Sequence, residues 1–217
     1  GNAVPLPIPT GYWRAVYNNQ CAFINESFMD EIAVAGGKDP LELRLSLLTD
    51  DKRIEVLQIA AEKAGWGTPL PAGWGRGIVQ FSTWDASHLA LVAEVSVAGD
   101  GSVRVQRVVC AANCGRVVNP SIVEAQIEGG IVFALSAALY GEITLEHGRV
   151  QQGNFSDYPV LRMNEMPLIE IHLVEATNSP SGMGEMAGPP TFAAVTNAVF
   201  AATGQRIRRL PIRKVSL

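Results

Sequence analysis

Apolar residues recur at helical spacing through the first third of the chain. The run from Ala22 to Gly36 has this period, and the Gly36-Gly37 pair supplies a C-terminal stop. Asp39-Pro40 predicts the cap and the first turn of a second, leucine-rich helix. Asp50-Asp51 predicts the start of a third helix that reaches about Ala64. The first third of the chain is therefore expected to be helical.

The period of the apolar residues changes to two after a glycine- and proline-rich stretch, Gly65 to Gly75. Arg76 to Phe81 is a predicted strand. Alternating residues in Leu89 to Val97 and in Val103 to Val109, on either side of a glycine-containing turn, predict a hairpin. The glycine- and proline-rich stretch is the best candidate for a domain boundary in this chain.

The second half of the chain combines both periods. Asn119-Pro120 predicts the start of a long apolar helix, Ser121 to Tyr140, and a short hairpin is expected around His147-Gly148. Pro167 to Val174 alternates like a strand, and Thr191 to Thr203 is predicted to be a helix. The fold class that follows is α+β, with N-terminal helices followed by a mixed sheet-and-helix unit.

Two segments are expected from these changes of period: a helical one over residues 1–66 and an α+β one over residues 74–217, which can also form one compact domain. The net charge of −4 supplies no basic stripe, which argues against a nucleic acid partner. No apolar run reaches the roughly 20 residues that cross a bilayer, and no signal peptide is visible, so neither is expected. A mean hydropathy of +0.15 indicates a large buried interface, within the chain or with another subunit.

Three cysteines, Cys21, Cys110 and Cys114, cannot all pair with one another and are expected to be reduced thiols. A zinc site built on Cys110 and Cys114 lacks two further ligands at short spacing. The three histidines also lack ligand spacing, so no metal ligand is assigned.

A carboxylate stands in a loop of small residues and prolines, Ser181 to Pro190. Glycines in such a loop let the backbone approach a ligand, and the prolines suit the first turn of a helix. Glu185 is the one acidic residue of this loop. It is either a solvated surface residue or a group held for its charge or basicity.

Three other segments look placed for a ligand. Trp13 and Arg14 precede the first helix, where an arginine can orient an anion or simply stack on the tryptophan. The turn Asn113 to Pro120 offers backbone amides and Arg116, or is an ordinary strand-to-helix connection. The long apolar helix opens with Gln126 and two glycines, which suit an approaching polar cofactor, while tight packing explains the glycines alone.

Taken in order, these segments resemble the C-terminal part of the molybdenum-binding large subunit of the xanthine dehydrogenase and aldehyde oxidase family. The resemblance rests on Asn113-Cys114-Gly115 through Asn119-Pro120, then Gln126-Ile127-Glu128-Gly129, then Gly182-Met183-Gly184-Glu185 and Pro-Pro. Trp13-Arg14-Ala15-Val16 and Gly75-Arg76-Gly77-Ile78 are most similar to the branch formed by the isoquinoline 1-oxidoreductase beta subunits.

The resemblance implies the C-terminal portion of a molybdopterin-binding domain, in an enzyme that inserts a water-derived oxygen into an aldehyde or N-heterocycle. Glu185 would be the catalytic general base. Gln126, Trp13 and Arg14 would contact the molybdopterin, and the loop Gly182, Met183 and Gly184 would approach it closely. The implied cofactors are molybdenum and molybdopterin, in the molybdopterin cytosine dinucleotide form, with [2Fe–2S] clusters on a partner chain.

The resemblance also leaves a gap, because the family's Gly-Gln-Gly-type cofactor loop is missing from this sequence. Part of the cofactor cradle is therefore expected on a complementary molybdopterin-binding chain, beside an iron–sulfur subunit. The alternative is a non-catalytic truncated fragment or assembly module that binds no cofactor by itself. The expected location is cytoplasmic, or periplasmic if the parent subunit is exported.

Overall fold

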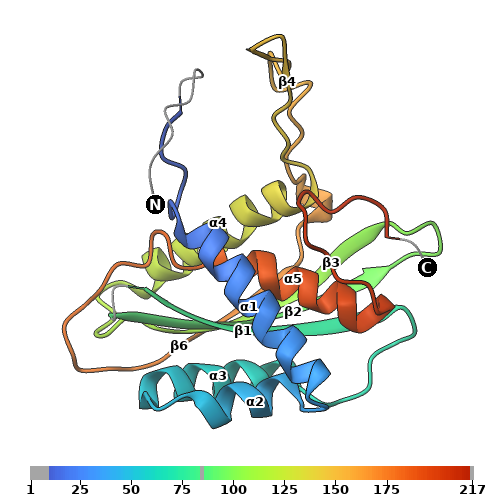
Figure 1. Cartoon of the computed structure of the whole chain (residues 1–217). Helices are drawn as coiled ribbons and strands as arrows, with labels where there is room; N and C mark the ends of the chain where they lie inside the picture. Colours follow the sequence, from blue (N-terminus) through green and yellow to red (C-terminus); the bar gives the residue numbers. More distant parts are fainter. Residues whose placement is uncertain (1–9, 84–85, 216–217) are drawn as a thin grey trace, which may run out of the picture.

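A four-stranded mixed sheet lies between two layers of helices, and the first helix of the chain runs past one edge of the sheet from one layer to the other (Figure 1). The computed structural model describes residues 10–83 and 86–215. The sheet has the order β1 (Trp74–Thr83), β2 (Ser87–Val97), β3 (Val103–Asn113) and β6 (Leu168–Leu173). β2 is antiparallel to β1 and to β3, whereas β6 is parallel to β3. The α+β prediction with a mixed sheet is therefore confirmed.

The first third of the described chain forms three helices, as predicted: α1 (Asn18–Ala35), α2 (Pro40–Leu47) and α3 (Asp51–Ala64). The side chain of Asp39 accepts hydrogen bonds from the first backbone amides of α2, and that of Asp50 does the same for α3. α1 begins four residues before the predicted start at Ala22. Its first turn carries polar residues that do not show the apolar period.

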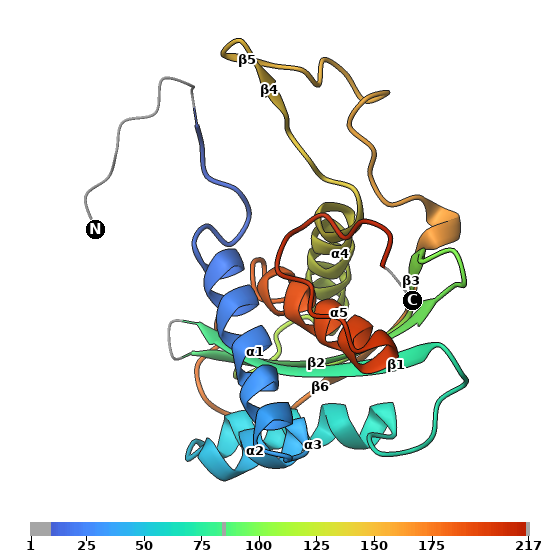
Figure 2. The same ribbon diagram turned by 45° about the vertical axis from the view of Figure 1, so that its right-hand side comes forward.

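The sheet is covered on both faces (Figure 2). α3 packs against one face with Val56, Leu57 and Ala60, while α4 (Pro120–Leu139) and α5 (Gly188–Thr203) cover the other. This arrangement explains the unequal alternation along β2, in which the larger residues, such as Leu89 and Leu91, face α4 and α5. α3, from the first predicted segment, thus packs on the sheet of the second. The division into two segments near residues 65–75 stays a prediction.

A β-bulge in β3 accounts for the one interruption in its alternation. The register between β2 and β3 shifts by one residue between Glu94 and Val95. Val105 and Val108 therefore both reach the core beneath α4 and α5, although they are an odd number of positions apart.

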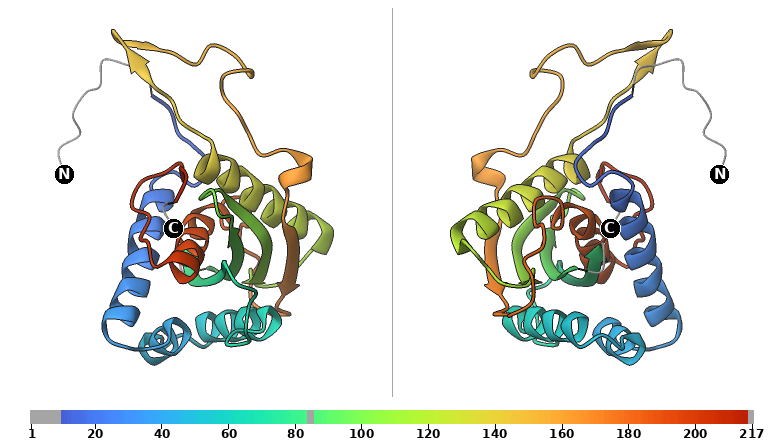
Figure 3. Two further views of the ribbon diagram at one scale, coloured as in Figure 1. Left: turned by 90° about the vertical axis from the view of Figure 1, so that its right-hand side faces the viewer. Right: turned by 90° about the vertical axis from the view of Figure 1, so that its left-hand side faces the viewer.

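A long excursion between α4 and β6 leaves the body of the protein (Figure 3). It contains the predicted hairpin, β4 (Leu145–Glu146) and β5 (Arg149–Val150), which turns through His147 and Gly148 at positive φ. The short 3-10 helix η1 (Met163–Glu165) then leads back to β6.

α4 is the one helix in the described ranges that is long and apolar enough to cross a membrane. The most apolar 18-residue window of this 20-residue helix has a mean hydropathy of 1.5, and 33% of that window is buried inside the fold. The buried side chains, including Ile127, Ile131 and Leu135, pack in the core on the sheet. Length and composition alone therefore do not separate α4 from a core helix.

Candidate functional site

Arg14 joins three segments that are distant in the sequence. Its Nε donates to the backbone oxygen of Gly184 at 2.6 Å, and its Nη2 donates to the backbone oxygen of Gln126 at 3.2 Å and to Gln126 Oε1 at 3.1 Å. The guanidinium thus links the loop before α1, the second turn of α4 and the loop that holds Glu185. The three segments, each a ligand candidate in the sequence, form one site.

Glu185 is held through one carboxylate oxygen. The backbone amide of Ala15 donates to Glu185 Oε1 at 3.0 Å, and the side chain is half-buried. Oε2 accepts no hydrogen bond from the described part of the chain. A carboxylate fixed at one oxygen and free at the other can accept a proton without changing its position.

The backbone that supplies this amide is strained. Ala15 and Val16 have φ values of 73° and 50°, a left-handed conformation that is unusual for alanine and more so for β-branched valine. Asn19, at the start of α1, donates from Nδ2 to the carbonyl oxygens of Arg14 at 2.7 Å and of Val16 at 3.0 Å. Sequence reasoning missed both Ala15 and Asn19, because neither residue type marks a left-handed turn or its support.

Gln126 and nearby glycines form an open surface beside Arg14. A Cβ on Gly184 would lie 3.6 Å from Gln126 Oε1, and a Cβ on Gly129 would lie 3.8 Å from Arg14 Nη1. A Cβ on Gly182 would meet nothing within 4 Å. Within residues 10–83 and 86–215, Gln126 Nε2 and Arg14 Nη1 donate no hydrogen bond to the protein. The site therefore presents free donors next to exposed backbone.

The side chains of Trp13 and Met183, two site residues predicted from the sequence, point away from the surface beside Arg14 and Gln126. The ring of Trp13 lies 4.5 Å from that of Phe133 in α4 and 6.2 Å from that of Phe192 in α5, so it anchors the loop. The side chain of Met183 is buried in the core beneath α4 and α5, which leaves only its backbone for a ligand.

The turn from Asn113 to Pro120 supports the loop of Glu185. Gly115 lies so close to the loop that a Cβ on it would stand 2.2 Å from the backbone oxygen of Ser179. The amide of Arg116 donates to Asn178 O at 2.9 Å, and the amide of Ser181 donates to Cys114 O at 2.8 Å. The turn thus works through its backbone, as a connection that fixes the base of the loop.

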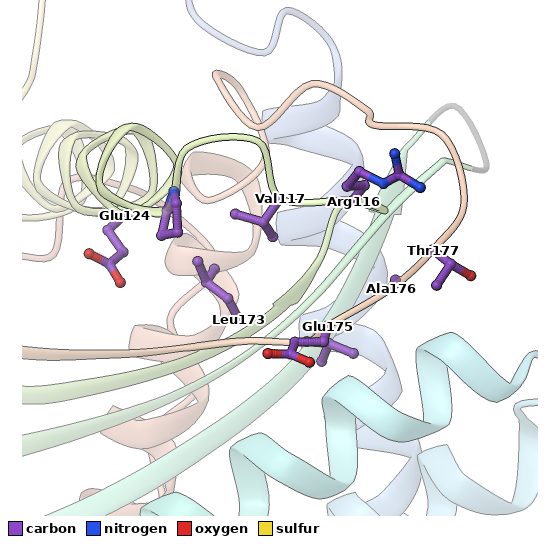
Figure 4. Close-up of a pocket in the computed structure, with 9 residues that line it drawn as sticks. Arg116, Val117, Glu124, Leu173, Glu175, Ala176 and Thr177 are labelled. Atoms are coloured by element: carbon purple, nitrogen blue, oxygen red, sulfur yellow. The ribbon is translucent and has the colours of Figure 1, made fainter.

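A cavity of about 640 Å³ lies beside this turn (Figure 4). Arg116, Glu124 and Glu175 line it together with apolar side chains of β6 and the start of α4. None of the residues around Glu185 contributes to its wall, so this cavity is separate from the candidate site.

The cysteines are free thiols. Cys110 and Cys114 are buried, and burial raises the pKa of each thiol. Among the described residues no group of three histidine, cysteine, aspartate or glutamate side chains could hold a metal ion. The two buried cysteines are therefore part of the core.

Comparison with known proteins identifies related sequences. A family model for a molybdopterin cofactor-binding domain matches residues 59–167. The chain is 36% identical over 206 residues to the beta subunit of isoquinoline 1-oxidoreductase from Brevundimonas diminuta, covering 93% of the chain and 26% of that relative. It is 35% identical over 225 residues to the B subunit of nicotinate dehydrogenase from Pseudomonas putida, covering 95% of the chain and 19% of that relative.

A solved structure supports the fold over nearly the whole chain. Aldehyde oxidoreductase from Desulfovibrio gigas superposes with a TM-score of 0.74 at 16% identity, covering 92% of this chain and 40% of that one. The chain therefore spans only 19% to 40% of the length of these three proteins.

Proposed function

Because the chain belongs to the molybdenum-binding large subunits of the xanthine dehydrogenase and aldehyde oxidase family, we propose that it supplies the general base and part of the molybdopterin site of a molybdenum hydroxylase. The observation that carries the proposal is the state of Glu185, which is held at Oε1 by the amide of Ala15 and open at Oε2. The complete enzyme would insert a water-derived oxygen into an aldehyde or N-heterocycle.

The residues around Glu185 fit a molybdopterin. This group is flat, polar and anionic, so it needs hydrogen-bond donors and a surface with little side-chain bulk. Arg14 Nη1 and Gln126 Nε2 are donors that the described protein leaves free, and their orientation is fixed by the bond between Arg14 Nη2 and Gln126 Oε1. Gly129 and Gly184 keep the adjoining backbone uncovered.

When bound, the molybdenum cofactor supplies the redox chemistry and the oxygen nucleophile of the reaction. The chain's own part is to hold the cofactor through Arg14, Gln126 and the backbone of Gly182 to Gly184, and to receive a proton at Glu185 Oε2. Glu185 would therefore act as a general base that takes a proton from the oxygen nucleophile.

The names of two relatives support one of the two substrate classes. Isoquinoline and nicotinate, named in the two relatives, are N-heterocycles with an electrophilic carbon next to nitrogen. We therefore favour an N-heterocycle over an aldehyde. Hydroxylation of an aldehyde panel with no turnover of isoquinoline- or pyridine-type compounds would reverse this preference.

The base assignment is tested in the assembled enzyme. The chain is co-expressed with candidate neighbouring subunits, and molybdenum content and hydroxylase activity are measured for the wild type and for Glu185→Gln. We expect unchanged molybdenum and a loss of kcat of about 100-fold or more, since general-base catalysis contributes about that much. Glu55→Gln, on α3, is the matched control. Full activity in Glu185→Gln contradicts the assignment.

The rival function, a non-catalytic fragment or assembly module, predicts a different result. An assembly of the chain with any of its partners would then contain no molybdenum, and Glu185→Gln would change neither its composition nor its stability. The free donors of Arg14 and Gln126 favour cofactor binding over this rival.

We further propose that the cofactor is the cytosine dinucleotide form and that [2Fe–2S] clusters on a partner chain accept the electrons. A complementary molybdopterin-binding chain would complete the cradle. Release of cytidine monophosphate on acid hydrolysis, and iron with a [2Fe–2S] electron paramagnetic resonance signal, test the two parts. We also propose that the assembly lies in the cytoplasm, or in the periplasm if its large subunit is exported, and cell fractionation tests this location.

A further inference from the structure

Two consecutive residues of the loop before α1 hold the backbone in the left-handed region. Ala15 and Val16 have φ values of 73° and 50°, and their conformation aims the amide of Ala15 at Glu185 Oε1. Neither residue prefers this conformation, so the neighbouring structure must impose it. The question is which contacts do so.

Asn19 brackets the strained pair. Its Nδ2 donates to the carbonyl oxygen just before the pair, on Arg14, and to the carbonyl oxygen at its end, on Val16. The residue is 7% exposed, and its Oδ1 is buried without a hydrogen-bond partner among the described residues. A Cβ built on Gly188, at the start of α5, would lie 3.9 Å from this oxygen. The amide thus gives both protons to the loop while its oxygen lies unpaired against α5.

Other contacts of the loop act on different groups. Arg14 ties its side chain to Gly184 and Gln126, and the ring of Trp13 packs on Phe133. These contacts place the loop against α4. Two backbone hydrogen bonds also close the turn, from Val16 N to Trp13 O at 2.8 Å and from Asn18 N to Ala15 O at 2.9 Å, but neither uses an atom of the peptide between Arg14 and Ala15. Asn19 holds the carbonyl oxygen of that same peptide, and the amide of that peptide is the group that meets Glu185.

We propose that Asn19 is a positioning residue for Glu185: it fixes the left-handed turn at Ala15 and Val16, and through the Ala15 amide it sets the position of the base. The inference rests on the proposed function of Glu185. A sub-ångström displacement of a catalytic group lowers kcat more than it changes substrate binding.

The first test needs no cofactor. Amide hydrogen exchange at Ala15 is measured in the 217-residue chain and in Asn19→Ala. We expect the amide to be protected in the wild type and to exchange about 10-fold faster or more in the variant, because its acceptor geometry is lost. Asn18→Ala, a neighbouring position of α1, should leave the exchange of Ala15 unchanged. Equal protection of Ala15 in wild type and Asn19→Ala overturns the proposal.

The second test uses the assembled enzyme. Asn19→Ala should lower kcat about 10-fold or more, with molybdenum content and KM within about twofold of the wild type. In a Glu185→Gln background the same substitution should cause no further loss, since it acts through Glu185. If Asn19→Ala lowers kcat by the same factor in the wild-type and the Glu185→Gln backgrounds, its effect is a general structural one and the proposal is overturned.

A rescue variant shows whether Asn19 acts by holding the left-handed turn or only by packing. Glycine adopts positive φ without strain, so Val16→Gly combined with Asn19→Ala should recover part of the lost kcat and of the Ala15 protection. No recovery of either quantity counts against the proposal. If Glu185→Gln is fully active, the base assignment itself fails, whereas an inactive Glu185→Gln beside a fully active Asn19→Ala removes only the role of Asn19.

Discussion

Gly77 of β1 lies against Ala194 of α5 with no room for a side chain: a Cβ on Gly77 would stand 2.2 Å from the carbonyl oxygen of Ala194. The same Cβ would stand 2.4 Å from the backbone nitrogen of Ala198. One turn of α5 farther along, Gly75 makes the corresponding approach to the carbonyl oxygen of Ala198. α5 carries the end of the Glu185 loop, so these glycines set how closely the loop sits on the sheet.

Gly77→Ala should destabilise the chain by about 3 kcal/mol or more, because both clashes are with backbone and only a shift of α5 can relieve them. Urea unfolding of the wild type and the variant measures the loss. Gly99→Ala is the matched control, since a Cβ there meets nothing within 4 Å. A loss in Gly77→Ala no larger than in Gly99→Ala contradicts the close packing of α5.

A buried ion pair joins the N-terminal helices to the sheet. Arg44 Nε donates to Glu26 Oε2 at 2.9 Å, and the two side chains are 3% and 16% exposed. Glu26 Oε2 also accepts a hydrogen bond from the backbone N–H of Gln80 in β1 at 3.2 Å. Arg44→Met leaves the carboxylate without its charge partner and should cost about 3–5 kcal/mol of unfolding free energy.

The double variant Arg44→Met with Glu26→Gln should recover part of this loss, because it removes the unpaired charge and keeps an acceptor for Gln80. The exposed pair Lys63–Glu62, 45% and 74% exposed, provides the control, and Lys63→Met should change stability by less than about 0.5 kcal/mol. Equal denaturant midpoints for Arg44→Met and Lys63→Met would contradict a stabilising role for the Arg44–Glu26 ion pair.

Residues with strong local signals predicted their own structure. Asp39-Pro40 and Asn119-Pro120 predicted the start of two helices, and both caps are present. The prolines after Glu185 lie in the first turn of α5, as their fixed φ requires. Such signals are local, since they depend on the backbone preference of the residue itself.

Features decided by tertiary contact were not visible in the sequence. Alanine and valine do not predict positive φ, so the turn at Ala15 and Val16 carried no local signal. The parallel pairing of β3 with β6 likewise depends on packing across the sheet. Arg14, Gln126 and Glu185 were candidates separately, and only the fold shows that Arg14 links the other two segments.

Arg14→Lys tests this link. Lysine cannot reproduce the two nitrogens that donate to Gly184 and Gln126 at once, so the loop of Glu185 should loosen. We expect a loss of about 1–2 kcal/mol in unfolding free energy and faster amide exchange over residues 182–186. Arg149→Lys, on the exposed strand β5, is the control. Unchanged exchange over residues 182–186 would show that the loop is held without Arg14.

The pair Tyr140 and Glu165 should make stability depend on pH on the alkaline side. Tyr140 donates its hydroxyl proton to the Glu165 carboxylate. Burial, followed by this hydrogen bond and the negative charge, raises the pKa of Tyr140 to about 12. Because the folded pKa exceeds the ordinary value of about 10, the stabilisation is complete below about pH 10 and is lost as the pH rises toward 12.

Tyr140→Phe should therefore be less stable than the wild type by about 1 kcal/mol at about pH 8, and this difference should shrink as the pH passes about 10. Urea unfolding of both proteins across this range measures it, with Tyr12→Phe, 94% exposed, as the control. A difference that stays constant from about pH 8 to about pH 11 would mean that the hydroxyl proton of Tyr140 contributes nothing to the stability of the fold.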